Sequence, residues 1–443
     1  MYTIIAKNKG KAILKPTADN ANAKPIIRIQ DQNDWNAVTY PKSRNTFIGL
    51  VISESTMTQW NSNGAPVAVD INYNSNPLFD ACTFSNNASQ YVFNTDQSSP
   101  EIRNSLIINN TTQNGVFNLN GGQDSTRPKT KVLRVVNSII ANNSYLSRNC
   151  CGAEKSAVIF NSIINENGYD ANFNDKFFRV VGSIVDNAKL LAQSASNKLL
   201  DPQFKNPSNS DYSLSSFSPA LGMAEAQFVI KGSQLNDTLN AINYDYNNQV
   251  RPNPTGTAGD VGAFESKYSV AAPQITRLQK ASKAITLTWE KPEASINYAS
   301  IKVYRDTIRT SLDTIAPLNI IVDLAKNTIT DELPNDKIYY YALKATVGSG
   351  ANEIKTGLSN VKSILDTIFI PALNFGVDTA SIRIQTGSRN GGHVSSLMHL
   401  VNLGSATTPG LPKLMFYSQE FKTVDSTSQS PNESDYLNVF NTI

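Results

Sequence analysis

Three arginines recur a short distance before a repeated apolar segment of the chain: Arg103, Arg134 and Arg179. If these segments stack on one another, the guanidinium groups gather on one face as a basic ladder. A planar guanidinium binds a carboxylate through two parallel hydrogen bonds, so such a ladder would suit acidic sugars. The alternative is that the arginines are solvated charges which mark the beginnings of strands.

The carboxylates and histidines are weaker candidates for a functional site than the arginines. Asp170, Asp175 and Asp186 lie near the ends of two repeats, and glycoside hydrolysis would need a pair of them on neighbouring coils. Asp is also an ordinary turn residue, which is the preferred interpretation. His393 and His399 lie six positions apart in a region without a clear pattern, and we do not interpret them as ligands.

The cysteines Cys82, Cys150 and Cys151 do not form a disulfide framework, because their number is odd and two are adjacent. A bridge between neighbours would be strained. We expect small, buried, apolar side chains. No cluster of cysteine and histidine has the spacing of zinc ligands, so no cofactor is expected from these residues.

Four segments share a small polar pair, an apolar run and an asparagine, and they recur at offsets of 33, 24 and 21 residues. Repeats of this length indicate a solenoid, because one unit cannot bury its apolar face alone. β-branched residues and a closing Asn favour a strand and a turn in each unit. We therefore predict a parallel β-helix. The segments are NSLIINN at 104–110, NSIIANN at 137–143, NSIINEN at 161–167 and GSIVDN at 182–187.

The apolar residues of these repeats are predicted to stack from coil to coil and to face the interior. The closing asparagines are predicted to hydrogen-bond along the stack and to close the bend between strands. Contact with a ligand is the alternative role for them. The predicted stack consists of Leu106, Ile108, Ile139, Ile163 and Ile184, and the asparagines are Asn110, Asn143, Asn167 and Asn187.

Length and charge bound the class of protein. The 443 residues are enough for about three domains. The net charge of +3, from 39 Lys and Arg against 36 Asp and Glu, argues against binding of nucleic acid or of an anionic membrane. No apolar stretch is long enough for a membrane span. Charged residues make up only 17%, and the abundant Asn, Ser and Thr are typical of extracellular β proteins, so export is expected although this chain shows no leader.

Five motifs between 200 and 265 occur in a fixed order: LDPQF, DYSL, SPALG, DYNNQVRP and GDVGAFE. This order resembles the C-terminal end of secreted bacterial right-handed parallel β-helix proteins of the choice-of-anchor or pectate-lyase-like superfamily. The resemblance implies that 1–268 is such a β-helix with a C-terminal cap over the last coil. Asp245, Arg251, Asp260 and Glu265 would be hydrogen-bonding and ion-pair partners in this cap, and Ca²⁺ bound by the carboxylates stays an open alternative.

The opening YTIIAKNKGKAILKP resembles the first coil of alginate- and chondroitin-lyase-like β-helices and of many non-enzymatic relatives. This resemblance therefore does not indicate whether the protein is an enzyme. Residues 269–364 carry alternating segments such as AITLTW and IYYYALKA, and their order resembles a fibronectin type III sandwich. In that resemblance Trp289 is the core tryptophan, and Leu333 and Tyr339 fit the tyrosine corner. Such a module is a spacer or a binding surface.

Residues 365–443 are predicted to form a further β domain. Ala372–Asp378 resembles the opening of laminin-G or concanavalin-like lectin sandwiches, although the first Asp of that opening is missing. A lectin domain would also be truncated at this length. A sorting domain of the kind used in type IX secretion is the alternative. The chain as a whole is therefore predicted to be all-β.

Together these features predict a modular bacterial protein of the cell surface or the extracellular space, with a non-catalytic role in surface architecture or adhesion. The expected partners are polysaccharides or surface glycans, and other surface or secretion-system proteins. Tyr145 and Tyr169 are predicted to contact sugar hydroxyls, together with the three arginines. The alternative is an enzyme, a polysaccharide lyase or glycoside hydrolase with the β-helix as its catalytic domain.

Overall fold

The structure is a computed structural model in which the chain divides into two compact units, residues 1–367 and 368–443, described separately below. In the part that it describes, no helix is long and apolar enough to cross a membrane. The described residues are 2–16, 24–30, 44–56, 66–72, 75–96, 98–120, 132–147, 156–170, 173–231, 236–281, 284–334 and 337–365, together with four short strands beyond 374.

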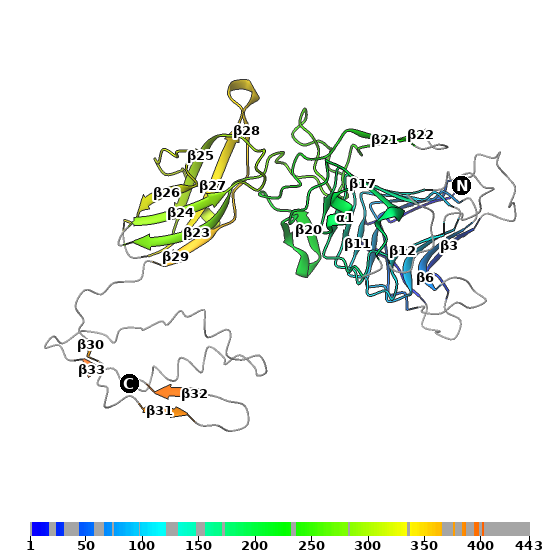
Figure 1. The fold of residues 1–443 in the computed structure, drawn as a ribbon, viewed down its shortest axis with the longest axis horizontal. Helices are drawn as coiled ribbons and strands as arrows, with labels where there is room; N and C mark the ends of the chain where they lie inside the picture. The colour runs from blue at the N-terminus through cyan, green and yellow to red at the C-terminus, as the bar shows by residue number, and fades with distance from the viewer. Residues whose placement is uncertain are drawn as a thin grey trace. The chain divides into compact units, whose positions relative to one another are not determined.

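Three parallel sheets form the first part of the chain (Figure 1). In the described residues the first four coils pass through all three sheets in turn, and the following three coils contribute strands to the first two sheets. Sheet A contains β1 (Thr3–Ile5), β4 (Thr46–Ile48), β7 (Leu78–Asp80), β10 (Glu101–Arg103), β13 (Leu133–Val136), β15 (Ala157–Phe160) and β17 (Phe178–Val181). Sheet B contains β2 (Ala12–Leu14), β5 (Leu50–Ser53), β8 (Thr83–Ser85), β11 (Leu106–Ile108), β14 (Ile139–Ala141), β16 (Ile163–Asn165) and β18 (Ile184–Val185). Sheet C contains β3 (Ile27–Gln30), β6 (Val67–Asn72), β9 (Tyr91–Asp96) and β12 (Gly115–Asn120). This arrangement confirms the predicted parallel β-helix.

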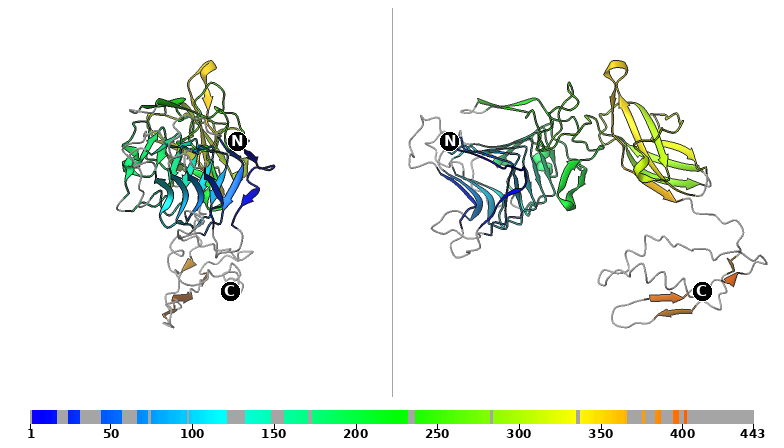
Figure 2. Two further views of the ribbon diagram at one scale, coloured as in Figure 1. Left: turned by 90° about the vertical axis from the view of Figure 1, so that its right-hand side faces the viewer. Right: turned by 180° about the vertical axis from the view of Figure 1, so that it is seen from behind.

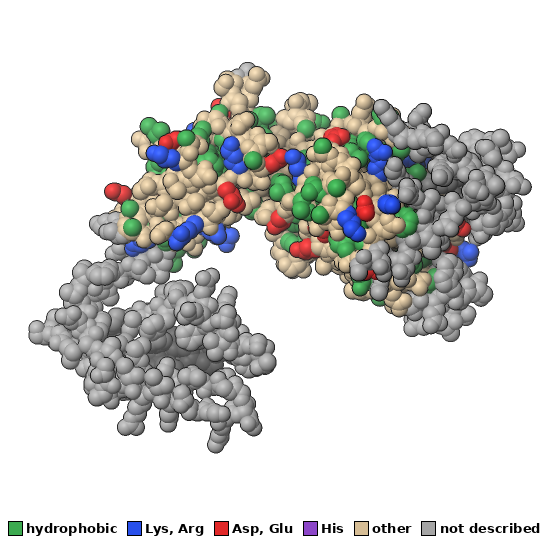
Figure 3. All heavy atoms as spheres, in the orientation of Figure 1, with side chains coloured by type: hydrophobic (Ala, Val, Ile, Leu, Met, Phe, Trp, Pro, Cys, Tyr) green, Lys and Arg blue, Asp and Glu red, His purple; other side chains and the backbone are tan. Residues whose placement is uncertain are grey.

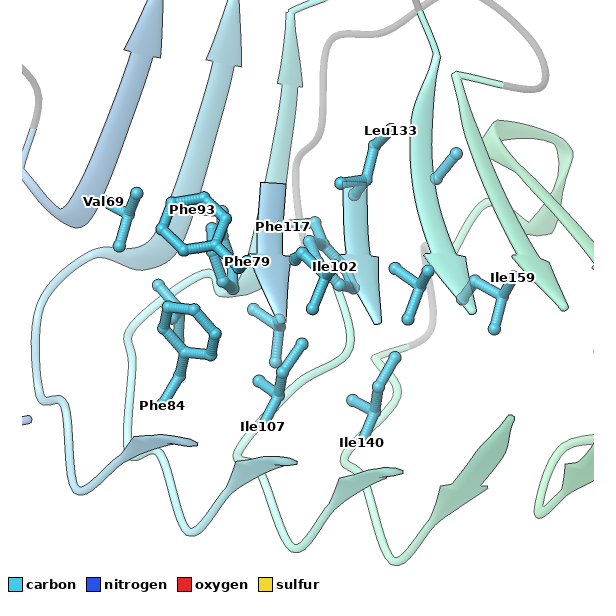
Figure 4. Packing of buried hydrophobic residues seen from close by; sticks show 14 of the residues in the cluster. Val69, Phe79, Phe84, Phe93, Ile102, Ile107, Phe117, Leu133, Ile140 and Ile159 are labelled. Atoms are coloured by element: carbon cyan, nitrogen blue, oxygen red, sulfur yellow. The ribbon is translucent and has the colours of Figure 1, made fainter. Parts of the chain in front are cut away.

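Columns of apolar side chains fill the interior of the coils. Figure 4 shows Phe79 and Ile102 from sheet A, Ile107 and Ile140 from sheet B, and Phe93 from sheet C pointing toward one another. Strict register produces the columns, because each strand places the same position opposite its neighbour. The sheet A column is Ile4, Phe47, Phe79, Ile102, Val135, Ile159 and Val180.

Of the predicted stack, Leu106, Ile139, Ile163 and Ile184 are paired in register along sheet B. Ile108 lies in the next column on the same face, where it is paired with Ala141, so its place in the stack is corrected. The prediction that the stack faces the interior is wrong. The neighbouring positions, such as Ile107, fill the interior, and the predicted stack lies on the outer face of sheet B. Both faces of β11 and β14 are buried, so these strands are apolar throughout and lack the alternation that would distinguish the inner face from the outer face. The outer layer is formed by Tyr212, Leu214, Ala220, Leu221, Val261 and Ala263.

The small polar pair in each repeat forms the corner between sheet A and sheet B. Its first residue has a positive φ, 47° at Asn104, 46° at Asn137, 50° at Asn161 and 60° at Gly182. Asn and Gly are the residues that adopt this conformation at least cost. The second residue is a serine whose hydroxyl accepts a bond from the backbone of the coil before, as Ser138 does from Ser105 at 3.1 Å.

The closing asparagines form the predicted ladder. Asn110 Nδ2 donates to Asn143 Oδ1 at 2.8 Å, and Asn143 Nδ2 donates to Asn167 Oδ1 at 2.8 Å. Asn87 adds a rung before them, at 2.9 Å from Asn110. The prediction for Asn187 is wrong, because the last rung is Asp186, which accepts from the backbone N–H of Asn167 at 3.1 Å. Asn187 instead caps the helix α1 (Ala188–Leu191) by accepting from the N–H of Lys189.

Residues 199–268, here called the covering segment, lie along the side of the stack. They carry the hairpins β19 (Phe204–Asn206) with β20 (Asp211–Leu214) and β21 (Gln227–Lys231) with β22 (Asn236–Asn240). The second hairpin packs its Ile230 and Leu239 on the outer face of sheet A. The segment reaches back to the first coil, where Lys9 Nζ donates to Asn248 Oδ1 at 3.1 Å. The last coil is covered by α1 instead, with Leu190 fully buried, so the predicted position of the cap is corrected.

The charged residues of the covering segment bind its own backbone, as predicted. Buried Arg251 forms an ion pair with Glu265 at 3.3 Å and donates to the carbonyl oxygens of Asp260 and Gly262. Asp245 accepts from the backbone N–H groups of three residues, Asn247, Gln249 and Glu265. These carboxylates thus have hydrogen-bonding or ion-pair partners within the protein. Binding of Ca²⁺ by them stays untested.

Residues 274–365 form two antiparallel sheets around Trp289, Leu333 and Tyr339, which share one core. Two tyrosine hydroxyls of this core donate hydrogen bonds, Tyr341 to Asp331 at 2.7 Å and Tyr298 to the carbonyl oxygen of Ala271 at 2.8 Å. A tyrosine corner at Tyr339 stays a prediction. The strands are β23 (Gln274–Ala281), β24 (Ala284–Glu290) and β26 (Thr328–Glu332) in one sheet, and β25 (Tyr298–Asp306), β27 (Ile338–Val347), β28 (Ile354–Lys355) and β29 (Lys362–Leu365) in the other.

In the second unit two antiparallel pairs are described, β30 (Phe375–Gly376) with β33 (Val401–Asn402) and β31 (Arg383–Thr386) with β32 (Val394–Leu397). The predictions for Cys150, Cys151, His393 and His399, and most of the proposed lectin-like or sorting domain, lie outside the described residues. Short 3₁₀ turns complete the chain at Asp175–Phe177, Pro207–Asn209, Arg309–Ser311 and Gly350–Asn352.

Candidate functional site

A groove of about 580 Å³ lies on the outer face of sheet A, between its strands β10 and β13 and the hairpin β21–β22 of the covering segment. The sheet side carries basic, acidic and amide groups, and the hairpin side carries hydroxyl, amide and aliphatic groups. The groove is lined by Arg44, Asn76, Ser99, Glu101, Arg103, Arg134, Val136, Thr238, Leu239, Asn240 and Ile242.

The parallel register brings the charged residues together. Glu101 is paired with Arg134 on the next strand, and Arg103 is paired with Asp80 on the strand before. Alternate residues of a strand point to one face, and Ile102 between Glu101 and Arg103 fills the interior. Glu101, Arg103 and Arg134 therefore share the outer face. Glu101 and Arg103 come from one strand, and Arg134 comes from the adjacent strand about 4.8 Å away.

Ion pairs connect these groups. Arg103 Nη2 lies 3.0 Å from Asp80 Oδ2, and its Nη1 lies 3.9 Å from Glu101 Oε1. Glu101 Oε2 also accepts a charged hydrogen bond from Arg44 Nη2. Arg134 Nη1 donates to the carbonyl oxygen of Val132 at 3.4 Å. Glu101 thus lies between the guanidinium groups of Arg44 and Arg103.

Tyr244 of the covering segment completes the network. Its hydroxyl donates to Asp80 Oδ2 at 2.6 Å and accepts from Arg103 Nη2 at 2.7 Å. Burial and the neighbouring carboxylate raise the pKa of Tyr244 to about 12, so the phenol is neutral at physiological pH. Burial opposes the charge on Arg103, but Asp80 outweighs it, and the pKa of Arg103 is raised. Tyr244 therefore supports Asp80 and Arg103 through hydrogen bonds, and its neutral phenol is not a base that could accept a proton.

Two of the three predicted arginines, Arg103 and Arg134, line this groove. Arg179 lies on the same face of sheet A, in the row of Arg134, but Val158 on the strand between interrupts the row. Its guanidinium lies 4.8 Å from the ring centre of Phe228, on the hairpin. The three arginines therefore share a face without forming a continuous ladder.

The two predicted tyrosines lie elsewhere. Tyr145 and Tyr169 follow sheet B, in turns of successive coils, and neither lines the groove. The Tyr169 hydroxyl donates to Asp186 at 2.5 Å, and its ring packs edge-on against Phe173 with centres 4.7 Å apart. These contacts give Tyr169 a structural role at the end of the asparagine ladder. Binding of sugars by either tyrosine stays a prediction.

Two of the three predicted carboxylates have partners in the described residues, and a catalytic pair among Asp170, Asp175 and Asp186 stays untested. Asp186 is bonded to Tyr169 and Asn167, and Asp175 accepts from Gln193 at 3.4 Å. Across the described ranges, no group of three or more His, Cys, Asp or Glu residues could hold a metal ion. Cys82 is fully buried, and burial raises the pKa of its thiol to about 12, so it behaves as a small apolar residue as predicted.

Sequence reasoning missed Arg44, Asp80, Glu101 and Tyr244. Glu101 and Arg103 are two positions apart in a strand, a spacing that places both on one face and was visible in the sequence. Tyr244 lies 141 residues from Arg103, and no local pattern connects them. Arg44 lies before the first repeat that the sequence made recognisable.

No protein-family model matches the chain, and no curated protein matches it. Among solved structures, the crystal structure of pectate lyase Pel9A is similar over 50% of this chain and 60% of that chain, with 15% sequence identity and a TM-score of 0.31. The chain thus spans about 60% of the length of that protein. A similarity at this level carries no argument about activity, and the parallel β-helix itself rests on the three sheets described above.

Proposed function

We propose that the β-helix binds acidic polysaccharide in the groove on sheet A and does not cleave it. The observation that carries this proposal is the convergence of Arg44, Arg103 and Arg134 in one groove of about 580 Å³. Guanidinium groups bind carboxylates in a planar, two-point geometry, which distinguishes uronate sugars from neutral ones.

The neutral side chains of the groove suit the rest of a sugar ring. Asn76, Ser99, Thr238 and Asn240 supply amides and hydroxyls that can bond to sugar hydroxyls. The lining comes from successive coils, so a polymer that crosses the strands meets one set of groups after another. On the face that Figure 3 shows, basic and acidic side chains are interspersed.

The contacts of the reactive groups support binding without cleavage. Tyr244 is neutral and donates to Asp80, so it is not a general base at physiological pH. The two carboxylates beside the groove, Asp80 and Glu101, are each in contact with arginine. Hydrolysis needs a carboxylic acid and a carboxylate on opposite sides of the scissile bond, and this pair is committed to other partners.

We further propose that the protein acts at the bacterial cell surface or outside the cell, in surface architecture or adhesion. The antiparallel sandwich of residues 274–365 would then be a fibronectin type III module that serves as a spacer. Residues 365–443 would add a lectin-like or sorting domain. Other surface or secretion-system proteins would be partners of these parts.

Isothermal titration calorimetry with polygalacturonate, alginate and neutral dextran tests the binding. We expect the two polyuronates to bind and dextran not to bind, with an affinity that falls as salt is added. Arg134→Ala should weaken binding. Arg179→Ala, on the same sheet face but outside the groove lining, is the matched control and should leave it unchanged. Equal binding of dextran, or equal loss in both variants, would contradict the proposal.

A lyase is the second candidate, because Arg103 and Tyr244 together are the types of residue that β-elimination uses. Incubation with the same polyuronates, followed by the ultraviolet absorbance of unsaturated ends and by assay of reducing ends, separates the two. Continued product formation that is lost in Tyr244→Phe would establish the lyase and refute the non-catalytic proposal.

A further inference from the structure

The chain passes from the covering segment into the sandwich through residues 269–273, here called the joint. Flexible linkers between domains are exposed and carry few contacts, so the domains that they connect move independently. The joint differs from such a linker, because Ala271 and Ala272 are 2% and 0% exposed. Figure 2 shows the green covering segment and the yellow-green sandwich meeting without an extended stretch of chain between them.

The backbone of the joint is hydrogen-bonded to both of its neighbours. The N–H of Ala272 donates to the carbonyl oxygen of Ser216, in the covering segment, at 2.9 Å. The carbonyl oxygen of Ala271 accepts from the hydroxyl of Tyr298, in strand β25 of the sandwich, at 2.8 Å. Bending at the joint would therefore break hydrogen bonds of buried groups, which is unfavourable.

Apolar packing continues across the joint. Ile296 of the sandwich packs against two clusters, the outer layer on sheet B, which includes Ala271, and the sandwich core around Trp289. Val270 of the joint packs against the same sandwich core. The two cores are therefore connected through apolar side chains.

Two polar contacts link the sandwich to the rest of the body beside the joint. Lys198, which extends sheet B beyond β18, forms an ion pair with Glu293 of the sandwich at 2.8 Å. The hydroxyl of Ser216 donates to the carbonyl oxygen of Leu358, also in the sandwich. Gly357 permits this close approach, because a Cβ at that position would lie 2.5 Å from the Cβ of Ser216.

We propose that the β-helix, the covering segment and the sandwich form one rigid body and unfold as a single cooperative unit. The sandwich stabilises the outer layer on sheet B and keeps a fixed orientation to the β-helix, so the joint is not a hinge. The spacer proposed above is then a stiff one. This inference uses no residue of the groove lining and does not depend on the binding of polysaccharide.

Hydrogen exchange of the whole chain, followed by mass spectrometry, tests the joint. We expect the amide of Ala272 to exchange about 1,000-fold or more slowly than the same amide in an unstructured peptide, as core amides do. In a series of urea concentrations, peptides from β16 and β24 should lose protection at the same midpoint. Exchange of Ala272 at the unstructured rate, or separate midpoints for the two strands, would overturn the proposal.

A charge placed between the two cores should uncouple them. Ile296→Asp buries a carboxylate at the contact of the two clusters, and we expect the urea midpoints of β16 and β24 to separate. Ile308→Asp, at a site 60% exposed in the sandwich, is the matched control and should leave the two midpoints coincident. Coincident midpoints in folded Ile296→Asp would contradict a coupling through this contact.

A milder variant keeps the proposal testable if Ile296→Asp does not fold. Ser216→Ala removes the hydroxyl bond to Leu358, and the exchange rate of the Ala272 amide should rise about fivefold or more. Ser208→Ala, at an exposed turn of the covering segment, should leave this rate unchanged. An unchanged rate in Ser216→Ala, or an equal rise in the two variants, would count against a fixed joint.

Discussion

The hydroxyl of Tyr244 donates to the carboxylate of Asp80 at 2.6 Å, although the two residues are 164 positions apart in the chain. The bond ties the covering segment to the third strand of sheet A. It also holds Asp80 against Arg103, so that the guanidinium of Arg103 keeps its place in the groove. One contact thus links the packing of the covering segment to the geometry of the proposed binding site.

Removing this hydroxyl should lower stability and change its dependence on pH. Tyr244→Phe loses the bond to Asp80, and we expect a decrease of about 1 kcal/mol in the free energy of unfolding. The folded pKa of about 12 lies above the ordinary value of 10.0, so this stabilisation is complete below pH 10 and is lost as pH rises toward 12. Urea unfolding of both proteins at pH 8 and at higher pH measures this. A difference that stays constant through the alkaline range would contradict the assignment.

Neutralising Glu101 should strengthen binding of acidic polysaccharide. Glu101 contacts Arg44 and lies 3.9 Å from Arg103, so a ligand carboxylate must displace it. Glu101→Gln removes this competing charge, and we expect affinity for polygalacturonate to rise severalfold at low salt. Calorimetry at two salt concentrations checks the result, with Glu353→Gln in the sandwich as the control. Weaker binding by Glu101→Gln would show that Glu101 itself contacts the ligand.

Breaking one rung of the asparagine ladder should be costly. Asn143 is buried, and its Oδ1 accepts from both the backbone N–H and the Nδ2 of Asn110. Asn143→Ala leaves those donors without a partner, and we expect a loss of about 2–4 kcal/mol in the free energy of unfolding. Asn209→Ala, at an exposed turn position, should change it by less than about 0.5 kcal/mol. Similar losses in the two variants in urea unfolding would refute a stabilising ladder.

The carboxylate that ends the ladder should make stability depend on pH. Burial raises the pKa of Asp186 above its ordinary 3.8, although bonds from Tyr169 and Asn167 oppose the shift. The folded state therefore holds the proton more tightly than the unfolded chain. Protonated Asp186 therefore adds to the free energy of unfolding. This contribution is complete below pH 3.8 and is lost as the pH rises through the raised pKa of Asp186 in the folded state.

Asp186→Asn removes that dependence. Relative to the variant, the wild-type protein should lose stability between acidic and neutral pH, and unfolding in urea at a series of pH values measures the difference. Asp175→Asn, in the 3₁₀ turn nearby, is the matched control. A wild-type protein that gains stability relative to Asp186→Asn over this range would show that hydrogen bonds to the ionised carboxylate dominate instead.

The repeats in the sequence determined the architecture of the first part of the chain. The Asn or Gly of each polar pair occupies a corner of positive φ, and Asn110, Asn143 and Asn167 form a ladder whose register follows from the repeat. These are local requirements, because a corner or a rung depends on its own residue type and on the same position one coil away. They can therefore be predicted from spacing alone.

Tertiary structure decided which apolar residues face the interior. Ile107 and Ile139 belong to equivalent apolar runs, but one lies inside the coil and the other under the covering segment. A strand that is buried on both faces shows no alternation, so its sequence cannot distinguish the two. The groove has the same origin, since Tyr244 meets Arg103 only when the covering segment folds back along the stack. Contacts between residues so distant in the chain depend on the packing of whole layers, and no local pattern encodes them.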